Sequence, residues 1–252
     1  MPPLAPPPVL TPDLLKSIRE HPDLPPRTWY IIAATTLTIL NRPDEIPRIY
    51  EHAATFGPRS TSSRPEQLTI LRRMREALIK TSAVGGVPKI INSLLALKKV
   101  SPPDLQDRPS TQSPTERRND FSDDPSRIEQ RGRDFFGKVY GKVADRVLSQ
   151  MDNSGTEDLG LVARLMYSHI LSNTLVLSAA DTSFVMIAAL IPQDVNPQLK
   201  GHLKGAINGG ATLEQVRAVR KVAIQICQGA GMTRLEDSGV AGWGWREDVA
   251  SI

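Results

Sequence analysis

One histidine stands out for its neighbours as well as for its own chemistry. His202 is flanked by Lys200 and Lys204, and Asn208 follows near the end of the same predicted helix. A histidine can accept or donate a proton near neutral pH, the lysines could attract an anion, and the asparagine could form a hydrogen bond. Apolar residues three before and four after His202 place its ring toward the packed side of that helix. Together these residues form a candidate site for acid–base chemistry on an anionic molecule.

A second pair of polar side chains, Tyr167 and His169, lies on a predicted helix spanning 158–171. A structural alternative exists for every one of these residues. Tyr167 could be a core tyrosine with a polar tip, and His202 could be a buried, hydrogen-bonded residue. Lys200 and Lys204 could belong to a solvated face. The residues themselves leave both interpretations open.

Thiol, metal and phosphate chemistry find little support in the sequence. Cys227 is the single cysteine, which excludes an intramolecular disulfide and an all-cysteine metal site. It falls on the apolar side of a predicted helix, where a thiol is inert. The four histidines show no metal-binding spacing, and no glycine-rich phosphate loop is present. We therefore expect neither a metal nor a cofactor.

Composition and charge narrow the class of protein. The formal charge of +4 comes from 31 basic and 27 acidic residues that are spread along the chain, so nucleic acid is not an expected partner. The longest apolar stretch, 29–40, is too short for a bilayer span of about 20 residues. The ends, including Ala250-Ser251-Ile252, match no targeting signal. We expect an intracellular protein, cytoplasmic, mitochondrial or peroxisomal, without a membrane span.

Helix signals recur along the chain and predict an all-α fold. Thr212 and Gln215 are placed for a capping box, and the segments 29–40 and 184–191 are apolar all round, which is typical of central helices. Starts in which proline occupies the first helical turn occur at Thr11-Pro12, Arg64-Pro65 and Asn196-Pro197.

The segment 100–126 is rich in Pro, Ser, Asp, Arg and Gln, and it predicts a flexible linker. It divides the chain into an N-terminal helical half, 1–99, and a second half, 127–240, followed by a tail, 241–252. The halves look alike, because Ala33-Ala34 matches Ala188-Ala189 and Arg75–Ile79 matches Arg220–Ile224. We expect two pseudo-symmetric repeats that stabilise each other. In the tail, Trp243 and Trp245 are predicted to dock on the domain or on a neighbour.

The second half carries a family resemblance. From Arg131 to Thr233 the chain is similar to the carboxymuconolactone decarboxylase domain. The first half shows a weaker similarity to the same domain, carried by Gly85–Pro88. The matching strings are Ser183–Leu190, His202–Gln215, Gly229–Gly231 and, upstream, Arg131-Gly132, Phe136–Lys138 and Val143–Arg146. The chain therefore resembles a duplicated, fungal-type member of the AhpD-like, carboxymuconolactone decarboxylase-like family.

This resemblance implies an AhpD-like helical fold, a homo-oligomer such as a trimer or hexamer, and eukaryotic relatives in mitochondria or peroxisomes. The family's thiol peroxidases carry Cys-x-x-Cys-x-x-x-His with an acidic residue upstream. When that pattern is anchored on His202, the cysteine positions are Val195 and Gln198, and the acidic position falls near Ser183. A peroxidase without a reactive thiol has no nucleophile, so this activity is the least expected.

Two other functions remain. The first is a cofactor-independent lyase or isomerase for a small carboxylated or lactone-like substrate, with His202 as acid or base and with Lys200, Lys204, Asn208, Tyr167 and His169 binding the substrate. It predicts a pocket beside His202. The alternative is a non-catalytic, oligomeric binding or scaffold protein, which predicts that His202 is buried against apolar residues with no cavity.

Overall fold

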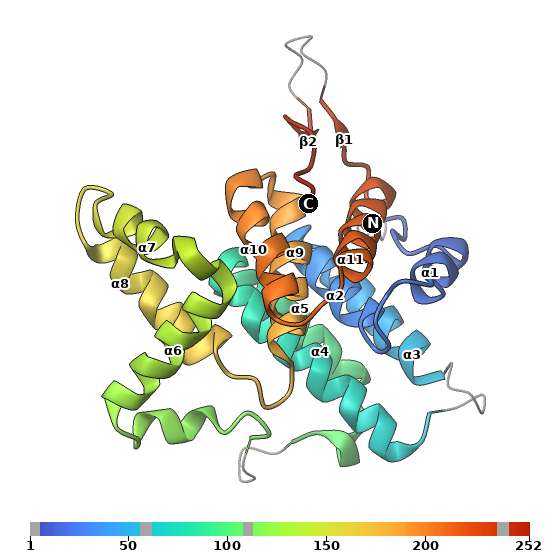
Figure 1. The fold of residues 1–252 in the computed structure, drawn as a ribbon. Coiled ribbons are helices and arrows are strands. Elements are labelled where there is room, and N and C mark those ends of the chain that lie inside the picture. The colour runs from blue at the N-terminus through green and yellow to red at the C-terminus, as the bar shows by residue number, and fades with distance from the viewer. Residues whose placement is uncertain (1–5, 56–61, 108–112, 236–241) are drawn as a thin grey trace.

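The computed structural model describes residues 6–55, 62–107, 113–235 and 242–252, and helices make up most of them (Figure 1). The predicted all-α fold is confirmed. The α-helices are α1 (Pro12–Arg19), α2 (Trp29–Ile39), α3 (Ile46–Thr55), α4 (Arg64–Gly85), α5 (Val87–Val100), α6 (Pro125–Tyr140), α7 (Ala144–Asp152), α8 (Asp158–Leu165), α9 (Ala179–Leu190), α10 (Asn196–Asn208) and α11 (Leu213–Gly229).

Shorter elements join these helices. The 3-10 turns are η1 (Pro43–Glu45), η2 (Pro103–Leu105), η3 (Arg117–Phe121), η4 (Gly141–Val143) and η6 (Ile191–Gln193), and η5 (Met166–Leu171) is a turn of π-helix. Two short strands, β1 (Thr233–Arg234) and β2 (Gly244–Trp245), pair in parallel near the C-terminus. The predicted helix over 158–171 is thus an α-helix that widens into a π-turn, which we call the π-segment (Met166–Leu171).

The helix starts follow from local capping chemistry. The Thr11 side chain accepts a hydrogen bond from Leu14 N at 3.2 Å, and α1 begins at the following proline. Thr212 and Gln215 form the predicted capping box at the start of α11. Such caps satisfy backbone N–H groups that have no partner within the helix.

The helices α2 and α9 form the centre of one hydrophobic core. Every residue of α2 is buried, as is α9 from Thr182 to Leu190. The two helices pack against each other, and each also contacts the long helix of the other half, α2 with α11 and α9 with α4 (Figure 1). The halves therefore bury a common core, and their description as two repeats stays a prediction.

The segment predicted as a linker takes part in the fold. Within 101–107 and 113–126, Leu105 is buried and Arg117 binds Glu76 of α4, while 108–112 lie outside the described residues. In the tail, Trp245 is buried and its Nε1 donates to the Ile191 carbonyl at 2.8 Å, whereas Trp243 is half exposed. Trp245 thus docks on the domain itself.

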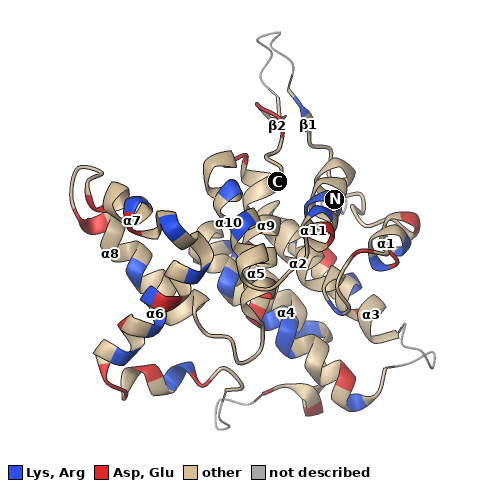
Figure 2. Cartoon of the chain, viewed as in Figure 1, with Lys and Arg blue, Asp and Glu red and all other residues tan. Residues whose placement is uncertain are grey.

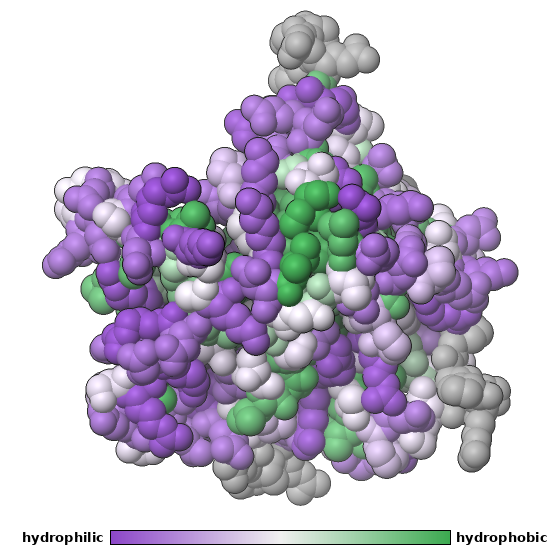
Figure 3. Space-filling model, in the orientation of Figure 1, coloured by the Kyte–Doolittle hydropathy of each residue, from purple (hydrophilic) through white to green (hydrophobic). Residues whose placement is uncertain are grey.

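The surface is mixed in charge and carries local apolar areas. Basic and acidic residues are both scattered over the helices (Figure 2), and the face drawn in Figure 3 shows an apolar strip between α10 and α11. Among the described residues, no helix combines the length and apolarity that a bilayer crossing requires. The helices α6, α7 and α8 form a lobe at one side of the core (Figure 1).

Candidate functional site

The His202 side chain lies inside the core. It is 5% exposed on α10, the helix that packs against α6 and α9, and its ring contacts Tyr140 edge-on at 6.1 Å between centroids. Its Nδ1 has no hydrogen-bond partner among the described residues. Burial lowers the pKa of His202 to about 4, because the charged imidazolium is disfavoured in the apolar interior. The ring is therefore neutral at physiological pH.

The residues predicted to act with His202 do not gather around it. Lys200 and Lys204 are exposed, so they lie on the solvent side of α10 while His202 faces inward. Asn208 is exposed, and its Nδ2 donates to the Val139 carbonyl at 3.1 Å, a contact that joins α10 to α6. His202 lines neither the cavity nor the groove described below.

Tyr167 and His169, in contrast, line a cavity of about 570 Å³. It lies in the lobe formed by α6, α7, α8 and the π-segment, with η3 at one end. Its apolar lining includes Phe121, Ile128, Phe136, Leu148, Leu161 and Leu165. Small-molecule sites in proteins have this size and are mostly apolar with a few polar groups. The π-turn in its wall is a second feature that favours a functional site here, because such turns occur frequently at functional sites.

His169 is the polar group of this wall with the most suitable surroundings for proton transfer. Its side chain is 38% exposed and its Nδ1 lies 3.7 Å from Asp120 Oδ2. Arg131 binds both oxygens of the Asp120 carboxylate, at 3.1 and 2.7 Å, and Phe121 stacks on the imidazole ring with centroids 6.2 Å apart. A carboxylate near one ring nitrogen helps to orient the imidazole.

Tyr167 joins the cavity to an aromatic cluster behind it. Its hydroxyl donates to the Tyr140 hydroxyl at 3.4 Å, and its ring meets Phe136 edge-on at 4.7 Å. Burial raises the pKa of both tyrosines, so each stays neutral. Tyr140 also contacts His202, and a layer of aromatic rings therefore lies between His202 and the cavity wall.

The cavity lining is more acidic than basic. Four carboxylates line it, against the two guanidinium groups of Arg133 and Arg164. Arg164 is held by both oxygens of Asp152 at 2.7 Å, and Arg133 binds the Gln130 side chain at 2.8 Å and lies 3.5 Å from Glu129. The arginines are thus already engaged, and three of the carboxylates, Asp120, Asp123 and Glu129, are paired with arginines in turn. Because these charges are paired and most of the lining is apolar, the cavity favours a neutral ligand over an anion.

A shallower groove runs along the other side of α6, with a volume of about 1100 Å³. Its lining is largely charged and polar, with Arg127, Lys138 and Ser178 among its residues. Because it is broad and open to solvent, it lacks the enclosure that small-molecule sites have.

The thiol and metal predictions can be placed on the structure. Cys227 is buried, and burial raises the pKa of its thiol, which keeps it unreactive. Ser183, at the position where the thiol-peroxidase pattern would place an acidic residue, is buried with its Oγ unpartnered among the described residues. In the described part of the chain, no cluster of three or more His, Cys, Asp or Glu side chains is arranged to hold a metal.

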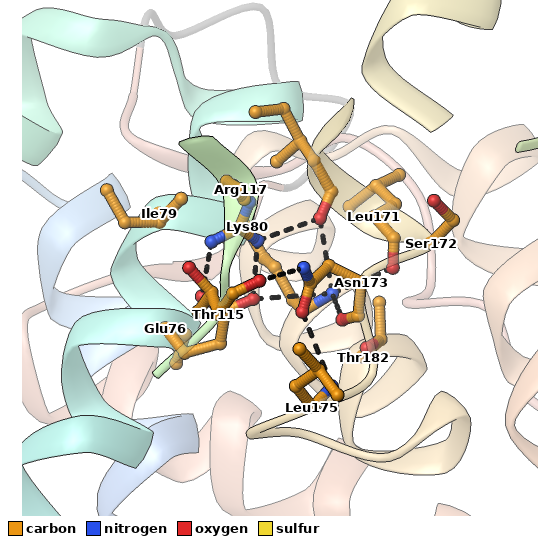
Figure 4. Close-up of polar contacts among 12 residues, drawn as sticks. Glu76, Ile79, Lys80, Thr115, Arg117, Leu171, Ser172, Asn173, Leu175 and Thr182 are labelled. Carbon is orange, nitrogen blue, oxygen red and sulfur yellow. Dashed lines mark hydrogen bonds and ion pairs between the residues drawn. The ribbon is translucent and has the colours of Figure 1, made fainter. Parts of the chain in front are cut away.

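Several residues around the cavity escaped the sequence analysis. Asp120 and Phe121 lie in the segment that its composition assigned to a linker. Lys80 and Glu76 of α4 were also missed, although a charged pair four residues apart on one helix is a readable signal. Both side chains are buried, and Lys80 binds carbonyl groups at the end of the π-segment (Figure 4).

Comparisons with known proteins identify relatives. The chain is 39% identical over 210 residues to Peroxisomal protein 2 of Schizosaccharomyces pombe, covering 83% of this chain and 90% of that protein. It is 31% identical over 268 aligned residues to Peroxisomal protein 2 of Saccharomyces cerevisiae, with coverage of 87% and 94%. No protein-family model matches the chain, and no solved structure matches it. The chain belongs to the family of these proteins named Peroxisomal protein 2.

Proposed function

We propose that this chain is a peroxisomal, AhpD-like protein that binds a small lactone-like carbonyl compound in the cavity beside the π-segment and isomerises it without a cofactor. The observation that carries the proposal is the arrangement of His169, Asp120 and Arg131 at the wall of a mostly apolar cavity of about 570 Å³. His169 takes the role of acid or base that the sequence assigned to His202.

The proposed chemistry needs one group that moves a proton. In a β,γ-unsaturated lactone, His169 removes a proton from the α-carbon, next to the carbonyl, and the electron pair forms a dienolate. The same proton then returns at the γ-carbon, so the C=C bond moves from the β,γ to the α,β position and no atom is gained or lost. The imidazolium formed in the first step lies beside the dienolate and balances its charge, the Asp120 carboxylate orients the His169 ring, and the apolar walls exclude water.

The charge of the lining supports one of the two ligand classes expected from the sequence over the other. A carboxylic acid would bring an unpaired anion into a mostly apolar cavity whose two lining arginines are already bound to other groups. A lactone is neutral, and an alkyl tail on its ring would contact the leucine and phenylalanine walls. We therefore place the lactone ahead of the free acid.

The compartment and the assembly rest on similarity. The names of the relatives support the peroxisome among the three compartments expected from the sequence. The AhpD-like resemblance supports a trimer or hexamer. Apolar residues that are half exposed on α5, Val87, Ile91 and Leu95, agree with burial against another subunit.

Ligand-induced thermal stabilisation tests the binding site. We expect δ-decalactone to raise the melting temperature of the wild type as RT ln(1 + [L]/Kd) requires, and 5-hydroxydecanoate, its ring-opened acid, to have little effect. Leu165→Glu places a charge in the cavity and should abolish the stabilisation. Leu159→Glu is the matched control, because Leu159 lies on the same helix, is similarly exposed and does not line the cavity. A larger effect of the acid, or unchanged binding by Leu165→Glu, would contradict the proposal.

A second candidate is a non-catalytic binding protein that uses the same cavity. It is favoured by the position of His202, which is buried beside Tyr140 and lines neither the cavity nor the groove, as that alternative predicted. Isomerisation of α-angelica lactone to its conjugated isomer, followed by ultraviolet absorbance, separates the two. Turnover that is lost in His169→Gln supports the isomerase, whereas binding without turnover supports the carrier.

A further inference from the structure

The carbonyl groups of the π-segment and the residues just after it are bound by three cationic side chains. Arg131 donates to the Ser168 carbonyl at 2.8 Å. Arg117 donates to the carbonyls of residues 169 and 170, at 3.1 and 3.0 Å. Lys80 Nζ donates to the carbonyls of residues 170, 171 and 173, at 3.3, 2.7 and 2.7 Å (Figure 4). Charged donors thus follow this backbone from Ser168 to Asn173.

These donors pair with carbonyl groups that have no backbone partner at the end of the π-turn. The last carbonyls of any helix lack partners within the helix, and here they face charged side chains of other elements. Buried carbonyls must be paired, and cations are the favoured partners at a helix C-terminus. The backbone N–H of Ser172 bonds the carbonyl five residues back, at Tyr167, with a length of 2.9 Å, which leaves the following carbonyls for the side chains.

The Glu76 carboxylate balances the charges of two of these cations, Lys80 of α4 and Arg117 of η3. Lys80 is 0% exposed, and its Nζ lies 3.6 Å from Glu76 Oε1. Arg117 binds both oxygens of Glu76 at 2.7 and 2.6 Å. Burial lowers the pKa of Lys80 to about 8, an effect that the Glu76 charge opposes, so the amine is mostly protonated at neutral pH.

The same cluster fixes the chain on either side. Asn173 Nδ2 donates to the Thr115 carbonyl at 2.6 Å, and Thr115 lies two residues before Arg117 in the chain. Asn173 Oδ1 accepts from Leu175 N at 3.3 Å. The end of the π-segment and the start of η3 are thus tied together, and η3 carries Asp120 and Phe121, which lie beside the His169 ring.

We propose that Glu76, Lys80 and Arg117 are positioning residues that hold the π-segment and η3 together and so set His169 against Asp120 in the cavity wall. The first half of the chain thereby supports a site that lies in the second half. The claim that these residues hold the backbone does not depend on the proposed function. The expectation that they affect ligand binding through His169 rests on it.

Hydrogen–deuterium exchange of the full chain, read peptide by peptide, tests the backbone part. Arg117→Gln is the main variant, because Arg117 is partly exposed and its loss is the one the fold should tolerate best. We expect amides of 166–173 to exchange at least about tenfold faster, with α11 unchanged. Arg117→Lys keeps the charge and should restore part of the protection. Arg75→Gln, which removes a comparable arginine bound to Asp107, is the matched control.

Unchanged exchange over 166–173 in a folded Arg117→Gln variant would overturn the inference, as would faster exchange spread equally over α11. Titration with δ-decalactone separates its failure from that of the proposed function. If the wild type binds no lactone but exchange changes as expected, the positioning role stands and the proposed function fails. If the wild type and Arg117→Gln bind lactone equally with equal exchange, the positioning role fails and the proposed function stands.

Discussion

The two histidines of the second half occupy opposite environments. His202 is enclosed by the core, with Tyr140 at its edge and a ring nitrogen unpartnered among the described residues. His169 is partly exposed on a cavity wall, stacked on Phe121 and close to a carboxylate that an arginine holds in place. Helical spacing and the resemblance to a family motif pointed to His202 as the site. Exposure to a cavity and a neighbouring carboxylate favour His169.

This difference shows what a motif position can and cannot predict. The string around His202 predicted a helix packed against the core, and α10 has that placement. Proton transfer to a ligand requires in addition a space that the ligand can enter and a partner that orients the ring. Both are present at His169, and both depend on residues that are distant in the sequence.

The largest expected effect comes from removing the support beneath His169. Lys80→Met leaves Glu76 and three carbonyls without their buried cation, and breaking a buried ion pair in this way costs about 3–5 kcal/mol. Urea denaturation should show this loss in the free energy of unfolding. Lys98→Met, at an exposed position of α5, should change it by less than about 0.5 kcal/mol. A loss below about 1 kcal/mol for Lys80→Met would contradict the role given to this lysine.

Acid should destabilise the protein through His202. The pKa of its buried ring is about 4, below the usual value of 6.5, so between these values the unfolded chain binds more protons than the folded one. The contribution is fully present above pH 6.5 and is lost as the pH falls toward 4, amounting to about 3 kcal/mol. His202→Phe should flatten the pH dependence of unfolding in this window, and His21→Gln should not. Equal slopes for all three proteins would exclude this assignment.

Close packing behind the cavity predicts opposite effects for two glycines of α6. A methyl group at Gly132 would lie 2.7 Å from Ser168 Cα in the π-segment, whereas one at Gly137 would meet nothing within 4 Å. Gly132→Ala should therefore cost about 1–3 kcal/mol through overpacking, and Gly137→Ala should stabilise the helix by up to about 1 kcal/mol. Melting temperatures compare the pair, and stabilisation by both would contradict the close contact of α6 with the π-segment.

The smallest effect on stability is expected at His169 itself. Its side chain is partly exposed and makes no close hydrogen bond among the described residues, so His169→Gln should change the free energy of unfolding by less than about 0.5 kcal/mol. The same change should abolish lactone turnover. Urea denaturation and the absorbance assay check the two halves of this prediction, and a strongly destabilised variant would indicate a structural histidine.

Much of the fold could be predicted from the sequence because its signals are local. The proline at the start of α1, the capping box of α11 and the all-apolar segments of α2 and α9 depend on residues within a few positions of one another. The two-residue strands β1 and β2 carry no comparable pattern. Their pairing depends on the return of the tail to the end of α11.

The site could be predicted only in part. Tyr167 and His169 were recognised as candidates, and they line the cavity. The roles of Asp120 and Arg117 were not, because the polar composition of 100–126 resembles a linker, and its order comes from distant partners such as Glu76. Helical spacing predicted that His202 points inward. It could not predict that the His202 Nδ1 would have no hydrogen-bond partner among the described residues, because that depends on how the helices pack.

The central claim is that a ligand reaches His169 and not His202, and nitrogen-15 NMR of selectively labelled histidines tests it most directly. The chain contains four histidines, and substitution of each to Gln assigns its imidazole signals. On addition of δ-decalactone we expect the His169 signals to shift and those of His202 to stay unchanged. Shifts at His202 with none at His169 would contradict the account and return the site to α10.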